Sequence, residues 1–210
     1  MPSSVKSPSL LDLSAIPRPA RSEALLDTLR QRVVIADGAM GTMLQDAGPT
    51  LDDFQQHEGC NEILNVSRPD IVESIHLAYL ETGIDAIETN TFGANWSNLS
   101  DYDIEDRIEE LARAGAEIAR RAAETVEARD GRMRWVLGSI GPGTKLPSLG
   151  HTTYDNLKVT FAEQAKGLIL AGSMRCSSRP RRTSCRPRRR STAASSLWCG
   201  RASACPSSSR

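Results

Sequence analysis

The amino-acid sequence predicts an α/β fold in which parallel strands alternate with crossover helices. Short apolar runs alternate three times with longer segments whose apolar residues recur every three or four positions. Polar residues, most of them with glycine, follow each apolar run. This order predicts parallel strands joined by right-handed crossovers. Doubly wound sheets and (β/α)8 barrels both fit, and both bind ligands at the carboxyl ends of their strands.

The first predicted strand is residues 33–36, a β-branched run that Asp37 and Gly38 bring to an end. This pattern is typical of a buried strand that leads into a loop. A short helix is expected just before it, at 22–32. Residues 1–20 hold four prolines and few apolar residues, so we expect a disordered leader with no signal peptide.

The first crossover helix is expected to begin at Ser67. Ser67 can cap the helix, Pro69 suits its first turn, and Asp70 is placed to close a capping box. Gly83 is expected to end this helix. The next predicted strand, at 84–89, follows directly.

Two further helices and one strand complete the pattern. A long amphipathic helix is expected at about 104–128, a strand at 134–140 and a third helix at about 154–171. No stretch approaches the roughly 18–20 apolar residues of a membrane span, so no membrane partner is expected. After Gly172 the pattern calls for a fourth strand, and the sequence there does not predict one.

The formal net charge of zero is the sum of two unlike parts. Residues 173–210 hold ten arginines and no lysine, aspartate or glutamate, which gives +10, so residues 1–172 carry −10. Arginine-rich segments can bind phosphate by counterion release. This tail has only Trp198 as an aromatic residue and no repeated arginine motif, so a nucleic-acid partner is not expected.

Four motifs lie in order at the predicted strand ends and helix starts. They are DGAMGTML at 37–44, EGCNEILN at 58–65, ETNTFGAN at 88–95 and GSIGPGTKLP at 138–147. Over about 30–172 this set resembles the homocysteine-binding domain of the cobalamin-dependent methionine synthase family. The resemblance implies a (β/α)8 TIM barrel, of which residues 21–172 would hold about the first three βα units.

The resemblance also implies where homocysteine binds. Asp37 would bind its amino group, and backbone N–H groups from Gly38 to Gly41 would hold its carboxylate, since glycine permits close backbone approach. The segment from Glu88 to Phe92 would line the floor of the pocket. The expected homocysteine-binding residues are Asp37, Gly38, Ala39, Met40, Gly41, Glu88, Thr89 and Asn90.

Zinc and cobalamin are the cofactors that the resemblance implies. In this family three cysteine thiolates hold a zinc ion that lowers the pKa of the homocysteine thiol. The methyl group arrives on cobalamin, which takes it from methyltetrahydrofolate on other domains. The family's zinc cysteines lie beyond position 172, Cys60 does not replace them, and the tail cysteines form no CxxC pair. We therefore expect no zinc site and no activity in this chain.

A changed reading frame near codon 172 is one explanation of the basic tail. If each codon takes the third base of one tail codon and the first two of the next, Met174 followed by a CGN codon becomes alanine. One consistent solution through Ala193 reads DAVLVETAQDVLQTKAAVNG, an apolar strand and a helix start. It also restores an acidic residue that the resemblance places on the fourth strand. Residues 173–210 are accordingly interpreted as a basic Ser/Arg-rich tail, frame-shifted or disordered.

Two alternatives to the methionine synthase interpretation stay open. One is a stand-alone homocysteine S-methyltransferase that uses another methyl donor. The other is a non-catalytic binding protein with a basic tail. The resemblance places the protein in the cytoplasm, where thiols are kept reduced.

Overall fold

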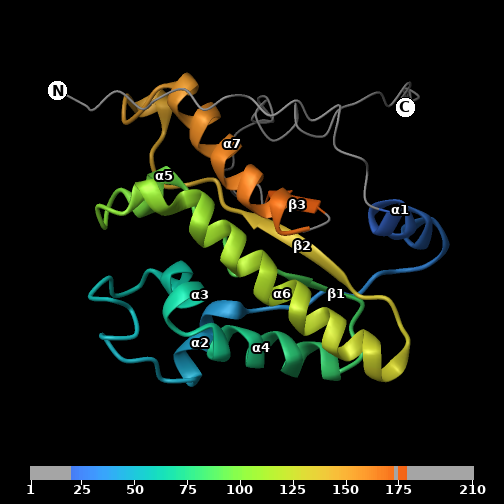
Figure 1. Ribbon diagram of the computed structural model, residues 1–210. Helices are drawn as coiled ribbons and strands as arrows, with labels where there is room; N and C mark the ends of the chain where they lie inside the picture. The colour runs from blue at the N-terminus through green and yellow to red at the C-terminus, as the bar shows by residue number, and fades with distance from the viewer. Residues whose placement is uncertain (1–19, 173–174, 179–210) are drawn as a thin grey trace, which may run out of the picture.

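The computed structural model describes residues 20–172 and 175–178 (Figure 1). Its strands form one parallel sheet in the order β1-β2-β3. The predicted alternation of strands and helices is confirmed between α4 and α7, over residues 69–170. The main elements are α1 (Ala20–Gln31), α2 (Met40–Asp46), α3 (Leu64–Ser67), α4 (Pro69–Glu81), β1 (Ala86–Glu88), α5 (Trp96–Leu99), α6 (Ile108–Asp130), β2 (Trp135–Ile140), α7 (Tyr154–Leu170) and β3 (Arg175–Ser178). Short 3-10 turns η2 (Asn61–Ile63), η3 (Glu105–Arg107) and η4 (Pro147–Leu149) connect them.

Strand β3 corrects the expectation that no strand follows Gly172. It pairs in parallel with β2, and Leu137 and Ile140 lie opposite Arg175 and Ser178. Backbone groups make this ladder, so an extended segment can join it without an apolar sequence. The rest of the basic tail, 179–210, and the predicted leader up to residue 19 lie outside the described residues.

The prediction of a buried strand at 33–36 is wrong, because the segment is largely exposed and hardly pairs with the sheet. Only Ala36 forms a bridge, to Ala86 of β1. Val33 is 80% exposed and Ile35 58% exposed. The described backbone bonds of this segment to the sheet all go to β1 and the residue before it, because no described strand lies on its other side.

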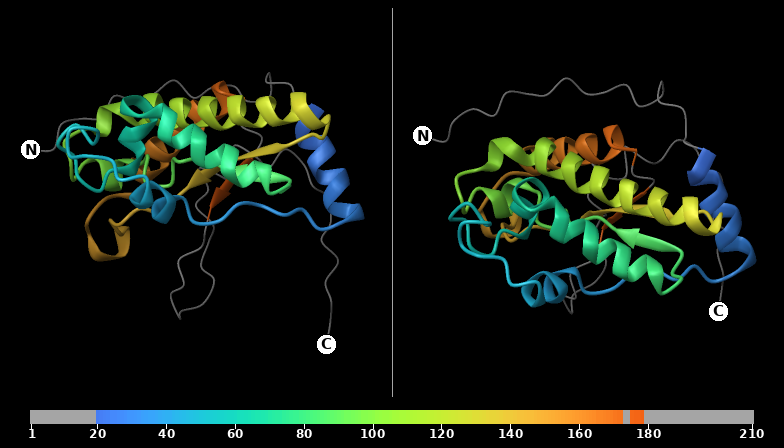
Figure 2. Two further views of the ribbon diagram at one scale, coloured as in Figure 1. Left: turned by 90° about the horizontal axis from the view of Figure 1, so that it is seen from below. Right: turned by 60° about the horizontal axis from the view of Figure 1, so that its bottom comes forward.

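Helices α4, α6 and α7 lie together on one face of the sheet (Figures 1 and 2). Helix α6 is the longest and packs between α4 and α7. Its predicted apolar stripe is confirmed. The buried stripe includes Ile108, Leu111, Gly115, Ile118, Ala122 and Val126. The helix starts four residues later than predicted, since Glu105–Arg107 forms a 3-10 turn before it.

The capping box predicted for α4 is wrong, although the helix itself is confirmed. The N-cap residue is Arg68, and it makes no side-chain cap. The Ser67 hydroxyl instead donates to the carbonyl of Ile63, four residues back at the end of the 3-10 turn η2. The Asp70 carboxylate accepts from the Arg68 guanidinium. Pro69 holds the first helical position, as predicted.

A buried carboxylate fastens the 33–36 segment to the sheet. Asp85 accepts bonds from the Arg32 guanidinium at 2.7 and 2.8 Å and from the Ile35 N–H at 3.0 Å. These donors favour the charged form, and they lower the pKa of Asp85 from 3.8 to about 2. Asp85 stabilises the fold above pH 3.8, and this contribution is lost as the pH falls through 2.

Replacing Asp85 by asparagine is expected to reduce the free energy of unfolding at pH 7 by about 2 kcal/mol. Urea unfolding followed by circular dichroism measures the change. Asp27→Asn is the control, because its ion pair to Arg30 is exposed. Equal stability of D85N and the unaltered chain would show that the carboxylate is not needed.

No helix of the described part is both long and apolar enough to cross a membrane.

Candidate functional site

Asp37 and Glu88 meet at the carboxyl ends of the sheet. An Asp37 carboxylate oxygen accepts the Glu88 backbone N–H at 2.9 Å, and the Asp37 N–H donates to the Ala86 carbonyl at 3.0 Å. The Ser139 hydroxyl on β2 donates to the Glu88 carboxylate at 3.2 Å. Two predicted site residues from different motifs are thus adjacent, and Ser139 from a third motif joins them. The Asp37 carboxylate thus lies against the Glu88 backbone, and a carboxylate forms strong charge-assisted hydrogen bonds to a cationic group such as an ammonium.

The loop after Asp37 leads directly into helix α2. Gly38 and Ala39 form the connection, and the helix begins at Met40. The Tyr79 hydroxyl of α4 donates to the Ala39 carbonyl at 3.3 Å, which holds the loop against that helix. The first N–H groups of any helix lack partners within it. The predicted residues Gly38 to Gly41 therefore supply backbone N–H donors in the segment that directly follows Asp37 in the chain.

Thr89 is buried, and its side chain bonds to protein rather than facing a cavity. Its hydroxyl lies 2.6 Å from that of Thr91 and accepts the Ser139 N–H at 3.0 Å. The Thr91 hydroxyl donates to the Ser139 carbonyl at 2.8 Å. Gln164 of α7, fully buried, donates to the Thr91 carbonyl at 2.6 Å. This network ties the ends of β1 and β2 to α7.

Asn90 joins the second motif to the third. Its side-chain amide donates to the Asn61 carbonyl at 2.8 Å and to the Asn65 side-chain oxygen at 3.0 Å. Asn65 returns a bond of 2.8 Å to the Asn90 carbonyl. Asn65 and Asn90 are buried, and each positions the other's side chain. Asn65, Ser139 and Gln164 were not predicted as site residues, although a polar residue within an apolar strand or stripe signals a buried hydrogen bond.

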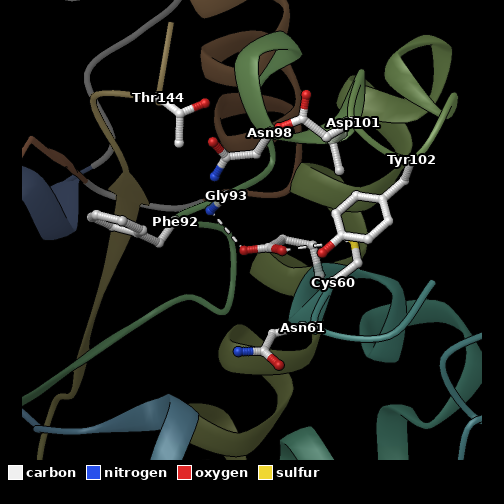
Figure 3. Close-up of a pocket in the computed structure, with 11 residues that line it drawn as sticks. Cys60, Asn61, Phe92, Gly93, Asn98, Asp101, Tyr102 and Thr144 are labelled. Atoms are coloured by element: carbon white, nitrogen blue, oxygen red, sulfur yellow. Dashed lines mark hydrogen bonds between the residues drawn. The ribbon is translucent and has the colours of Figure 1, made fainter.

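A separate cavity of about 340 Å³ lies between the second motif and the loops that follow β1 and β2 (Figure 3). Glu62 forms part of its wall, and one oxygen of its carboxylate accepts the Gly93 N–H at 2.6 Å. Glu62 is 8% exposed, and burial raises its pKa. The cavity is lined by Gly59, Cys60, Asn61, Glu62, Phe92, Gly93, Asn98, Leu99, Asp101, Tyr102 and Thr144.

Cys60 does not fit the role of a zinc ligand. It is buried, and burial together with the nearby Glu62 carboxylate raises its pKa to about 12. A metal ligand must be the thiolate, which this environment disfavours. Within 20–172, no group of three or more His, Cys, Asp and Glu side chains is placed to hold a metal ion. The described residues therefore do not fit the zinc that the resemblance implies.

Comparison with known proteins gives a family and a fold. A model of the family "Homocysteine S-methyltransferase" matches residues 34–174. The chain is 58% identical over 149 residues to the methionine synthase of Mycobacterium tuberculosis and 57% identical to that of Mycobacterium leprae. The alignments cover 71% of this chain but 12% of each relative, so the chain spans a small part of their length.

Solved structures of the homocysteine methyltransferase MmuM from Escherichia coli share the fold. The metallated form superposes with a TM-score of 0.59 at 21% identity and covers 73% of this chain and 56% of its own. The oxidized form gives a TM-score of 0.56 at 24% identity. The described sheet and helices thus correspond to just over half of that enzyme.

Proposed function

This chain belongs to the homocysteine S-methyltransferase family, and from that membership we propose that it is the first part of a homocysteine-binding (β/α)8 barrel. The meeting of Asp37 and Glu88 carries the proposal. The ammonium group of homocysteine would bind the Asp37 carboxylate beside the end of β1, where Ser139 orients Glu88. Its carboxylate would accept N–H groups from the segment between Gly38 and Gly41. Thr89 and Asn90 would hold the floor of the pocket through their bonds to protein.

The methyl transfer that we propose for the whole protein is that of a methionine synthase. Methylcobalamin, itself methylated from methyltetrahydrofolate, would give its methyl group to homocysteine and form methionine. Identity of 58% to a methionine synthase supports this donor over the alternative of a stand-alone enzyme, since the solved homocysteine methyltransferase of E. coli is 21–24% identical. Folate- and cobalamin-binding parts would lie in the much longer full protein.

We propose that the chain by itself does not catalyse methyl transfer to homocysteine. Bound zinc would supply the acidity that makes homocysteine a thiolate, and the described residues do not fit a zinc site. A methylation assay of this chain with methylcobalamin, homocysteine and zinc is expected to give no methionine. Stoichiometric zinc with turnover would contradict the proposal.

Asp37→Asn is expected to weaken homocysteine binding by about 10- to 100-fold, the usual value of a hydrogen bond to a charged group. Isothermal titration with L-homocysteine measures the dissociation constant. Asp46→Asn, which alters an exposed carboxylate at the end of α2, is the control. 4-Mercaptobutanoate, which lacks the amino group, should bind both proteins equally weakly. The assignment of Asp37 fails if D37N binds homocysteine as the unaltered chain does.

We also propose that residues 173–210 are translated in a shifted frame. Similarity to the family ends at residue 174, where the charge changes sign, which supports a break at this point. Sequencing the gene downstream of codon 172 tests the proposal. A shifted frame that encodes an apolar strand and continues to resemble the family is expected. An intact frame in a transcript that encodes this tail would refute it.

A basic-tailed binding protein is the alternative of a different class. Filter binding of single-stranded nucleic acid across a salt series, with the full chain and a chain ending at residue 172, distinguishes it. We expect no salt-dependent difference between the two. The cytoplasm remains our proposed location, and a buried free thiol at Cys60 is compatible with a reducing compartment.

A further inference from the structure

The cavity beside Gly93 is lined by a buried carboxyl group that forms no ion pair with a described residue (Figure 3). Glu62 is 8% exposed. One of its oxygens accepts the Gly93 N–H at 2.6 Å, and the other lies 3.9 Å from the Cys60 sulfur. A carboxylate is costly to bury without a cation, and this burial raises the pKa of Glu62. The group therefore favours its proton until a cation takes the place of that proton.

Asn98 borders the same point of the cavity. A Cβ atom built on Gly93 would lie 2.7 Å from a Glu62 carboxylate oxygen and 3.0 Å from the Asn98 side-chain nitrogen, so the two side chains converge there (Figure 3). The Asn98 side-chain oxygen is buried and has no hydrogen-bond partner among the described residues. Nearly all buried polar atoms of folded proteins have a partner. A donor on a ligand in the cavity would supply the partner that Asn98 lacks.

The other ionisable groups around the cavity are neutral, exposed or already paired. Burial raises the pKa of Cys60 to about 12 and also raises the pKa of Tyr102, so both keep their protons at pH 7. The charged side chains nearby are the exposed Glu58 and the ion pairs Asp101–Lys145 at 3.0 Å and Arg107–Glu110 at 2.8 Å. Glu62 is accordingly the group in the cavity wall that a cation would pair with.

We propose that this cavity binds a small primary ammonium ion, which donates N–H groups to Glu62 and to the side-chain oxygen of Asn98. The volume of about 340 Å³ is within the range of small-molecule sites. An ammonium group carries a positive charge and three N–H donors, so it serves both side chains at once. On binding, the cation replaces the proton of Glu62, and that proton passes to solvent.

A metal ion fits the cavity less well. Within the described part of the chain, no three His, Cys, Asp or Glu side chains are grouped to hold one. The proposed site is also separate from the homocysteine site, because neither Asp37 nor Glu88 lines the cavity. Thr144 and Tyr102 do line it, and their hydroxyl groups would suit a hydroxyl on the short chain of the ligand.

Urea unfolding of the full chain in ethanolammonium chloride tests the proposal. Tetramethylammonium chloride at the same concentration is the salt control, since it has the charge but no N–H donor. Ethanolammonium at ten times its dissociation constant is expected to raise the ratio of folded to unfolded protein about tenfold above this control. The increase is expected to grow as the pH rises through the pKa of Glu62 and then to level off, because binding releases a proton.

Two variants locate the ligand. Glu62→Gln keeps an oxygen for the Gly93 N–H, and Asn98→Leu keeps the size of the side chain, so both are expected to fold, which circular dichroism checks. Each is expected to reduce the effect of ethanolammonium to less than about twofold. Glu105→Gln, which alters an exposed carboxylate in η3, is the control and should retain the full effect.

The proposal is overturned if the two salts act equally, or if E62Q and N98L respond to ethanolammonium as the unaltered chain does. An effect that Asp37→Asn removes and E62Q retains also overturns it, because the ammonium ion would then occupy the proposed homocysteine site. Homocysteine titration of E62Q and D37N tests the proposed function separately, since only D37N is expected to weaken that binding.

Discussion

Replacing Gly141 by alanine is expected to destabilise the protein by about 3 kcal/mol, a value typical of overpacking at a rigid site. Gly141 follows β2, and its N–H donates to the Phe92 carbonyl at 2.9 Å. A Cβ atom built on Gly141 would lie 2.3 Å from that carbonyl oxygen and 3.0 Å from the Phe92 ring. The obstacle is backbone, so rotation of a side chain cannot relieve it. The loops after β1 and β2 would have to separate.

Urea unfolding monitored by circular dichroism measures the effect. Gly41→Ala is the matched control, because its Cβ would meet only the Asn61 side chain, at 3.8 Å. That variant is expected to change stability by no more than about 1 kcal/mol, the difference in helix propensity. If G141A and G41A unfold at the same urea concentration, the close approach of the two loops is not as described.

Acid is expected to weaken the fold through His76, by about 3 kcal/mol between pH 6.5 and 4. His76 in α4 is fully buried, and neither ring nitrogen has a hydrogen-bond partner among the described residues. Burial lowers its pKa from 6.5 to about 4, although the Glu73 carboxylate acts in the opposite direction. Between these values the unfolded chain binds a proton that the folded chain does not. Stability therefore falls as the pH falls through this range.

A His76→Leu variant isolates this contribution. It is expected to lose the His76 part of the pH dependence and to be at least as stable as the unaltered chain at pH 7.5, because it removes an unpaired polar group. Glu62, whose pKa is raised, contributes with the opposite sign in both proteins and cancels in the comparison. His151→Gln, at an exposed position, is the control. Parallel stability curves for H76L and the unaltered chain from pH 6.5 to 4 would contradict the role of His76.

The strongly periodic parts of the fold could be predicted from the sequence. Helix α6 has an apolar residue every three or four positions over its whole length, and β2 is apolar and bounded by glycine, so one pattern dominates in each. The start of α4 was harder, since Ser67 can bond backward to Ile63 as readily as it can cap the helix. Strand β3 could not be predicted, because its pairing depends on the free edge of β2 and not on its own side chains.

The candidate site could be predicted in its identity but not in its connections. Asp37 follows the extended segment 33–36 and Glu88 ends β1, and parallel topology brings such ends together. The sequence does not reveal that Asp37 bonds the Glu88 backbone or that Ser139 reaches the Glu88 carboxylate. Those contacts depend on the strand register, which is set by packing across the sheet.

The buried amide of Gln164 bears on the order in which this protein folds as the ribosome makes it. Its bond to Thr91 spans 73 residues, and that contact cannot form until α7 has been synthesised. Strands β1 and β2 are complete by residue 140, yet they remain without their bond to α7 while the next two dozen residues are added. Contacts between residues so far apart in the sequence form slowly, and apolar surface stays exposed during synthesis until they do. The nascent chain therefore passes through a stage in which β1 and β2 are complete but α7 does not yet cover them, when most apolar surface is available to a molecular chaperone.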